Sequence, residues 1–585
     1  MHSSAVTMQE NPFNPSLSSE NSYVTERILS NDFADFIFPP YGPLFSMAEN
    51  QPDSVFMRIW STAYAVYINR QNNPALSLSN YPYRSIPKCY GLMNEESLEQ
   101  SGILTMQNYP GLNLKGQGIL LGFIDTGINY TNPAFLSETG ESRIFSIWDQ
   151  TVQDGTPPEG FFYGSEYTRE QLNEALRSED PFLAVPSRDE IGHGTFLASV
   201  AAGSPNPAEN FTGAAPLADI IMVKVKQAKP YLKEYYRIPE DADVYQENDL
   251  MLAVNYLTAK ARLVQRPLVI CFGMGTSLGD HTGTSPLADY LNFAAENRGV
   301  GVVVCTGNEA DAQHHYRGLV IGQDAFEDVE LRIGENSNGF TMELWTSYPN
   351  QYTIAFLSPS GESIPRIPAR LDQNDIFSFV FEPTKIAVDY DLAEDRTGAQ
   401  LIQIRFIQPT AGVWRIRIYG NETNLGPYDM WLPIRQFLES DTYFLKPDPY
   451  NTLTEPSAAD LVITVGAYQA SDVSYFLESG RGFTRNNRVK PDFLAPGVNI
   501  QGTIFPGRYE SQSGTSIAAA VASGAVAQLF TWAFTLGNDT SISASVIKNY
   551  FIRGADRKAF LMYPNEEWGY GSLNLYQTFE RLRIQ

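Results

Sequence analysis

Cysteine is scarce in this chain, with three residues among 585. Cys89, Cys271 and Cys305 are too few for a disulfide framework and too far apart in the sequence for a zinc site, and the five histidines do not complete one. We therefore expect reduced thiols, no metal site and no cofactor.

Positive charge is also in short supply. Lys and Arg number 41 against 66 Asp and Glu, which gives a formal net charge of −25 at pH 7. A chain of this charge is repelled by the phosphate backbone of nucleic acids and by anionic lipid headgroups. We therefore exclude nucleic acid and membrane surfaces as partners.

Two further absences concern targeting and membrane insertion. Residues Met1 to Phe13 contain neither the basic nor the apolar segment of a secretory signal, so no signal peptide is visible and we expect a cytoplasmic location. The longest apolar stretch, Ile517 to Phe534, is rich in alanine and carries Ser523, Gln528 and Thr531. That composition favours a buried helix over a membrane span.

Apolar residues are plentiful, at 43% hydrophobic and 12% aromatic, which is enough for a large packed core. From Gly118 onward, helical patterns alternate with short apolar runs that are typical of strands buried on both faces. These runs are Gly118 to Ile124, Ile220 to Val225, Leu268 to Phe272, Val300 to Cys305 and Leu461 to Val465. The pattern predicts an α/β fold over residues 81–318 and 446–585, with helices on both faces of a parallel sheet.

Two regions depart from this rhythm. Residues 1–80 are predicted to form a small N-terminal α+β module, after a first stretch of about thirty polar residues that we expect to be mobile. Residues 319–445 contain many strand-like runs separated by turns, among them 402–407 and 413–418. They predict a β-sandwich, or jelly roll, inserted into the α/β core.

Three short motifs carry candidate chemistry. Asp125 ends a buried strand, where open α/β sheets place their active sites. His193 lies between two glycines at the start of a buried helix, and Ser516 opens the alanine-rich helix. Each residue alone has an ordinary structural interpretation: a turn aspartate, a core histidine and a helix cap. Together, in the order Asp, His, Ser, they suit nucleophilic acyl transfer.

These motifs, Asp125-Thr126-Gly127, His193-Gly194-Thr195 and Gly514-Thr515-Ser516-x-Ala518, resemble the three signatures of subtilisin-like serine proteases. The resemblance implies a subtilisin-like sheet, with Ser516 as nucleophile, His193 as general base and Asp125 as the residue that orients the histidine. It further implies that Asn308 lines the oxyanion hole. Residues Gly273, Met274 and Gly275 are expected to bind the substrate beside its P1 side chain.

A closer resemblance is to the clostridial Csp germination proteases, and it rests on Tyr81 to Asn94 and on Trp568 to Asn574 in addition to the inserted jelly roll. Members of that group carry an N-terminal prodomain that assists folding and is removed by self-cleavage. Some activate a cortex-degrading hydrolase in spores, and others have lost triad residues and act as pseudoproteases. The resemblance thus implies a protein or peptide substrate, the protein's own prodomain as a partner, and a spore-associated location as the alternative to a cytoplasmic one.

Three hypotheses follow. The first is a serine endopeptidase that matures by self-cleavage, with the extended segment Leu76 to Lys88 passing through the active-site cleft. The second is a catalytically silent pseudoprotease that acts as a signalling or scaffold protein. The third is a sandwich protein that binds a carbohydrate or another ligand, with the α/β core as a scaffold. The complete set of Asp125, His193, Ser516 and Asn308 favours the first.

Overall fold

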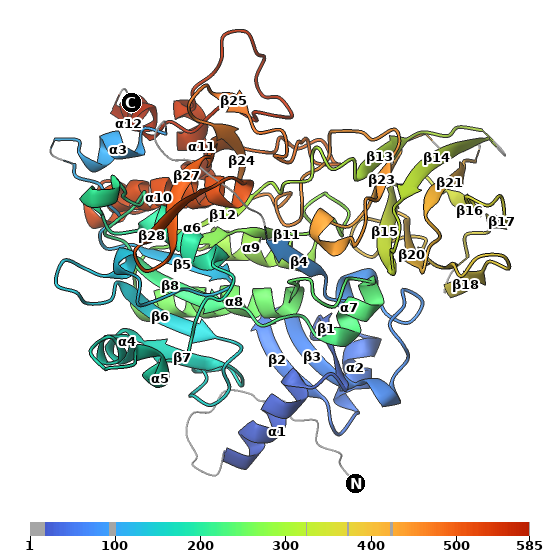
Figure 1. Cartoon of the computed structure of the whole chain (residues 1–585), viewed down its shortest axis with the longest axis horizontal. Coiled ribbons are helices and arrows are strands. Elements are labelled where there is room, and N and C mark those ends of the chain that lie inside the picture. Colours follow the sequence, from blue (N-terminus) through green and yellow to red (C-terminus); the bar gives the residue numbers. More distant parts are fainter. Residues whose placement is uncertain are drawn as a thin grey trace.

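A computed structural model describes residues 18–92, 101–110, 112–322, 325–370, 374–421 and 425–583. At its centre is a nine-stranded sheet (Figure 1). In sheet order the strands are β25 (Ser474–Tyr475), β24 (Ile463–Gln469), β12 (Val300–Cys305), β10 (Leu268–Phe272), β5 (Leu120–Asp125), β8 (Asp219–Lys224), β6 (Ile144–Asp149) and β7 (Ser165–Thr168), with β26 (Phe493–Val498) also paired to β24. All neighbours run parallel except β25 and β7, which pair antiparallel.

Helices cover both faces of this sheet, as the apolar runs predict. Successive residues of one strand enter opposite cores: Leu121 and Phe123 pack with the helices on one face, and Leu120 and Ile124 with those on the other. The first face is covered by α6 (His193–Ala202) and α10 (Thr515–Phe530), and the second by α8 (Glu247–Leu263) and α9 (Pro286–Glu296). Since both faces of each strand are buried, the strands need the continuous apolar sequence that they have.

Smaller elements surround the sheet. The remaining helices with α geometry around it are α3 (Ile103–Gln107), α4 (Arg169–Leu176), α5 (Pro181–Ala184), α7 (Pro230–Tyr236), α11 (Ala544–Gly554) and α12 (Leu575–Arg583). Helix α4 begins with a capping box, in which Thr168 N donates to the side chain of Gln171 at 2.8 Å. A hairpin of β27 (Ile500–Phe505) and β28 (Arg508–Gln512) lies against α6.

One helical segment, Thr515–Thr535, is long and apolar enough to cross a membrane by length and composition alone. Within it, 89% of the most apolar window is buried inside the protein. It consists of α10 and the short π-helical turn that follows, and it packs between α6 and strands β10, β12, β24 and β26. The segment is therefore the core helix that the sequence predicts.

The N-terminal module is a three-stranded antiparallel sheet in the order β1-β3-β2, with two helices. Its elements are α1 (Ser18–Leu29), β1 (Phe33–Phe38), α2 (Pro43–Glu49), β2 (Val55–Trp60) and β3 (Ala63–Asn69). One face of this sheet packs on α8, where Val55 and Met57 join the core beneath the central sheet. The expectation of a mobile first thirty residues is wrong for 18–29, which form α1; residues 1–17 lie outside the described part.

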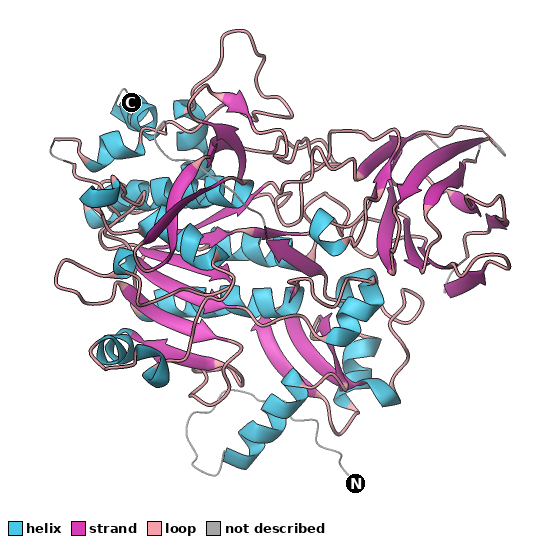
Figure 2. Cartoon of the chain, in the orientation of Figure 1, coloured by secondary structure: helices cyan, strands magenta, loops and turns pink. Residues whose placement is uncertain are grey.

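The insertion is a sandwich of two antiparallel sheets at one end of the molecule (Figures 1 and 2). One sheet comprises, in order, β13 (His315–Gly318), β22 (Tyr428–Trp431), β15 (Gly339–Thr346), β20 (Leu401–Ile407), β19 (Lys385–Asp391) and β18 (Asn374–Ser378). The other comprises β17 (Ser363–Ile367), β16 (Thr353–Leu357), β21 (Gly412–Tyr419), β14 (Phe326–Ile333) and β23 (Tyr443–Phe444). The facing residues form a core separate from that of the central sheet. The predicted α/β fold with an inserted sandwich and a small N-terminal α+β module is therefore confirmed.

A third small sheet joins distant parts of the chain. Strand β4 (Cys89–Leu92) lies between β11 (Met274–Gly275) and β9 (Tyr245–Gln246), and both pairings are antiparallel. The strand that follows the N-terminal module is thus hydrogen-bonded on both edges to the α/β domain.

Candidate active site

Asp125, His193 and Ser516 meet at one edge of the central sheet. Asp125 is the last residue of β5, His193 the first of α6 and Ser516 the second of α10. His193 Nδ1 lies 2.7 Å from Asp125 Oδ1, and His193 Nε2 lies 3.2 Å from Ser516 Oγ. All three side chains are buried. The hydroxyl, imidazole and carboxylate form a continuous hydrogen-bonded series, which is the arrangement that nucleophilic catalysis by serine requires.

Close packing between β5 and α6 explains the glycines in two of the motifs. A Cβ on Gly194 would lie 2.3 Å from the carbonyl oxygen of Gly127 and 2.9 Å from Asp125 Cβ. Gly127 itself has a φ of +123°, a conformation that favours glycine. Glycine at both positions therefore lets His193 approach within hydrogen-bonding distance of Asp125.

Asp189 holds the start of α6, and the sequence analysis did not identify it. Its Oδ1 accepts from Gly192 N at 2.7 Å and from Thr126 Oγ1 at 2.8 Å, and its Oδ2 accepts from the Thr195 backbone N at 2.8 Å and from Thr195 Oγ1 at 2.7 Å. One buried carboxylate thus ties the Asp125 motif to the His193 motif. An aspartate four residues before a helix-opening histidine is the signal that would have indicated it.

Asn308 lies in the loop after β12 and faces the start of α10. Its Oδ1 accepts from Thr515 N at 3.1 Å and from Thr515 Oγ1 at 2.9 Å. Thr515 Oγ1 also accepts from Gly307 N at 3.1 Å. Because Oδ1 is engaged by Thr515, the side-chain NH₂ group is directed to the opposite side of the amide. These bonds fix the amide plane of Asn308 next to Ser516.

Residues Gly273, Met274 and Gly275 extend from the catalytic side chains as a short strand. A Cβ built on Gly273 would lie 3.2 Å from Ser516 Cβ and 3.4 Å from His193 Cε1, so the backbone of this glycine passes close to both side chains. The other two residues form β11, and Met274 is buried. The structure therefore brings together all seven residues that the sequence analysis singled out.

The protein's own chain is paired with β11. In the antiparallel register, Gly91 is opposite Gly275 and Leu92 is opposite Met274, so the chain runs along β11 in the direction of Gly273. The segment predicted to pass through the cleft was Leu76 to Lys88; the paired strand instead begins at Cys89, just after that range. Strand pairing depends on tertiary contacts, so the extended character of the predicted segment does not show which residues pair with β11.

The matching family model is the subtilase family of S8 peptidases, and it aligns with residues 116–338 and 419–571. These ranges cover more than half of the chain and contain Asp125, His193, Asn308 and Ser516. The chain belongs to the subtilase family. The predicted resemblance is confirmed, and the protein is a subtilisin-like serine protease.

A solved structure similar to this subtilase is that of the CspB protease of Clostridium perfringens. The two chains share 33% sequence identity with a TM-score of 0.74, over 83% of this chain and 96% of that one. Curated relatives are more distant. A C5a peptidase of Streptococcus pyogenes serotype M1 is 22% identical over 454 residues, or 73% of this chain and 35% of that protein. The subtilisin-like protease SBT3.5 of Arabidopsis thaliana is 24% identical over 467 residues, or 71% of this chain and 56% of that protein. The chain thus spans about a third of the length of the C5a peptidases.

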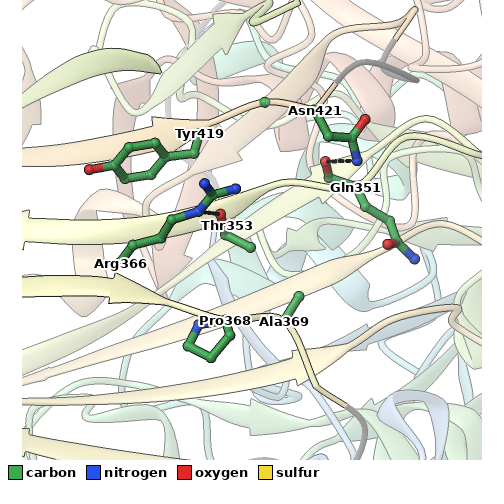
Figure 3. A pocket seen from close by; sticks show the side chains of 8 residues that line it. Gln351, Thr353, Arg366, Pro368, Ala369, Tyr419 and Asn421 are labelled. Carbon is green, nitrogen blue, oxygen red and sulfur yellow. Dashed lines mark hydrogen bonds between the residues drawn. The ribbon is translucent and has the colours of Figure 1, made fainter. Parts of the chain in front are cut away.

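A metal ion or a carbohydrate would need a different kind of site in this subtilase. Among the described residues, no group of three or more His, Cys, Asp and Glu side chains has a geometry that could hold a metal ion. A pocket of about 400 Å³ lies on the outer surface of the sandwich (Figure 3). Its lining includes one aromatic side chain, Tyr419, and the guanidinium of Arg366 lies 4.7 Å from the centre of that ring. An aromatic face covered in this way does not offer a stacking platform for a sugar.

Proposed function

We propose that this subtilase is a serine endopeptidase that cuts its own chain after the N-terminal module. The observation that carries the proposal is strand β4. Gly91 and Leu92 of the enzyme's own chain pair with β11, which directly follows Gly273 beside Ser516, in the antiparallel manner of a peptide substrate. The bond that is cut lies in the segment that follows Leu92.

In the proposed mechanism, Ser516 Oγ attacks the scissile carbonyl while His193 Nε2 takes its proton. Asp125 accepts a hydrogen bond from His193 Nδ1, which fixes the tautomer and stabilises the imidazolium that forms. The Asn308 side-chain amide and the Ser516 backbone N–H donate to the oxyanion. His193 then gives its proton to the leaving amine, and water hydrolyses the acyl-enzyme by the same route in reverse.

Loss of the nucleophile tests the proposal most directly. The purified wild-type protein should separate into fragments of roughly 10 and 55 kDa, by proportion of the 65.2 kDa chain. Ser516→Ala should remain one band. Ser523→Ala is the matched control, because Ser523 lies on the same helix, away from the catalytic side chains, and donates to the Ala519 carbonyl at 2.7 Å. Terminal sequencing should locate the new N-terminus beyond Leu92, and the rate should not depend on protein concentration.

The pseudoprotease hypothesis predicts the opposite result. A wild-type chain that stays intact, and whose Ser516 does not react with a fluorophosphonate probe, would show that the serine is not activated. Labelling of wild type but not of Ser516→Ala would instead support an activated nucleophile even where self-cleavage is slow.

Asn308 has a separate expected signature. If its amide binds the oxyanion, Asn308→Ala should lower kcat by roughly 10²–10³ with little change in KM, because the interaction exists only in the transition state. Peptide hydrolysis measured over a range of substrate concentrations separates the two constants. An unchanged kcat would assign the oxyanion to another donor.

The biological substrate is proposed from the resemblance to the Csp group alone. On that basis the spore-associated enzyme activates a cortex hydrolase zymogen by limited proteolysis during germination. The test is incubation of the zymogen with wild-type and Ser516→Ala enzyme, followed by sequencing of any new terminus. Absence of cleavage by an enzyme that cuts itself would reject this role and leave the peptidase activity standing.

A further inference from the structure

Residues of the insertion pack against β4. After strand β22 the chain passes over Gly91 through residues 434–437. A Cβ built on Gly91 would lie 2.5 Å from Ile434 Cδ1, 2.9 Å from Gln436 Oε1 and 3.4 Å from Phe437 Cε1. We call Ile434 and Phe437 the roof. Under it there is no space for any side chain at Gly91.

The roof is packed and cannot readily swing aside. Ile434 and Phe437 are both fully buried, and they belong to the same apolar core as Cys89. The atom nearest the added Cβ is the end of the Ile434 side chain, and because that side chain is itself fully buried, it must repack to make room. Forcing an extra carbon into a filled core requires strained side chains or a shifted backbone.

The roof is also tied to the loop of Asn308. The Arg435 backbone N donates to the carboxylate of Glu309, at 3.3 Å to Oε1 and 3.2 Å to Oε2, and the Arg435 guanidinium pairs with Asp311. Glu309 also accepts from His314 Nδ1, at 3.0 Å. Since Glu309 follows Asn308 directly, the roof and the proposed oxyanion loop are held as one unit.

The other two sides of β4 are closed by hydrogen-bonded strands. Tyr90 pairs with Tyr245 of β9, and Gly91 pairs with Gly275 of β11. A peptide in this position is therefore enclosed by β9, β11 and the roof, and its residue opposite Gly275 meets the roof. Because pairing with β11 fixes the peptide backbone, a larger side chain opposite Gly275 would overlap the roof.

We propose that the roof makes this protease specific for substrates with glycine at the position opposite Gly275. The inference rests on the proposed function, because it treats Cys89 to Leu92 as the substrate. It names the substrate class as extended peptides of the type Tyr-Gly-Leu, with glycine two residues before the residue that would lie opposite Gly273. Ile434 and Phe437, which belong to the insertion and not to the catalytic motifs, are then the residues that determine specificity.

The test is self-cleavage of the full chain. Gly91→Ala should slow the appearance of the two fragments by at least about tenfold, and Gly91→Val by more, because each added carbon overlaps the roof. The double variant Gly91→Ala with Ile434→Ala should regain cleavage to within about threefold of wild type, since the shorter side chain makes room. The matched control is Gly91→Ala with Ile376→Ala, which removes the same atoms from an isoleucine of the sandwich that is 63% exposed. This control should stay slow.

Each outcome decides between explanations. If Gly91→Ala cuts itself at the wild-type rate, the roof does not select glycine and the inference is overturned. If Gly91→Ala fails to fold, rescue of both folding and cleavage by Ile434→Ala supports the roof, and a double variant that neither folds nor cuts overturns it. Wild-type chain that neither cuts itself nor reacts with a fluorophosphonate contradicts the proposed function instead, and removes the role of the roof with it.

Discussion

The N-terminal module and the inserted sandwich both adjoin the active site, but they are attached in different ways. The interior of the module is continuous with the two cores of the α/β domain. Met57 belongs to the core that contains α8 and α9, and Phe36 to the core that contains α6 and α10. The sandwich has its own core of facing strands. It meets the α/β domain through several side chains, among them Trp431, whose ring stacks on that of His281 with 3.9 Å between the ring centres. The module should therefore fold with the α/β domain, and the sandwich as a unit of its own.

A buried ion pair links the module to the α/β domain. Asp35 of β1 pairs with Lys229, and it also accepts from Gln246 Nε2 at 2.7 Å and from Asn248 Nδ2 at 3.2 Å. Asp35→Asn leaves the Lys229 charge buried without its partner, so the free energy of unfolding should fall by about 3–5 kcal/mol. Urea denaturation of the Ser516→Ala chain, which is expected to stay intact, measures this loss.

Asp53→Asn is the matched control in the same module. Its partner, Arg27, lies 3.1 Å away, and the Asp53 side chain is 47% exposed to solvent. Such surface pairs contribute about 0–1 kcal/mol. Equal effects of Asp35→Asn and Asp53→Asn would mean that the buried pair is not what anchors the module.

A substitution in the core of the sandwich should destabilise the sandwich and leave the stability of the α/β domain unchanged. Ile404 of β20 is fully buried in the sandwich core, and Ile404→Ala should cost about 2–5 kcal/mol, from lost burial and a residual cavity. Calorimetry should show the transition of the sandwich moving to lower temperature while that of the α/β domain stays. A single transition that moves as a whole would show that the two regions unfold together.

The last expected effect is a change in how stability depends on pH. It concerns Glu343, a carboxyl group that joins the sandwich to the α/β domain. Glu343 of β15 accepts from Tyr83 OH at 2.8 Å, from Gly279 N at 3.0 Å and from Trp345 Nε1 at 3.0 Å. Burial raises the pKa of Glu343 above its ordinary value of 4.5. The folded protein then retains a proton that the unfolded chain loses, so stability is greatest below the ordinary pKa and falls as pH rises through the raised one.

The slope from this single group is at most about 1.4 kcal/mol per pH unit. Stability curves measured from pH 4 to 8 should lose this slope in Glu343→Gln, while wild type retains it. Identical curves for the two proteins would mean that Glu343 is charged in the fold across this range.

The parts predicted from the sequence are those where chemistry or burial fixes the residue type. Both ends of the strand Leu268–Phe272 were predicted correctly, because every position in it is apolar. Helix α1 was missed because its buried face consists of Val24 and Ile28 within an otherwise polar segment. Strand β19 was missed although Ile386, Val388 and Tyr390 alternate along it and lie in the sandwich core. The antiparallel edge β7 carries no signal of its direction.

The candidate site divides in the same way. Serine, histidine and aspartate were found because few side chains perform their roles and each of the three lies in a recognisable short motif. The roof was not predicted, because Ile434 and Phe437 act through the volume of their side chains, and many apolar residues have a similar volume. Their importance depends on which strand passes beneath them, and only the register of β4 against β11 shows that.

The order of the elements along the chain has a consequence for synthesis. The nucleophile is residue 516 of 585, so it emerges from the ribosome after the module, the cleft strand and the whole sandwich. Domains fold largely from the N-terminus as they are made. Every residue that encloses β4 has therefore been synthesised before the hydroxyl that would attack the chain exists. The position of Ser516 in the sequence thus delays catalysis until the module, β4 and the sandwich have all been synthesised.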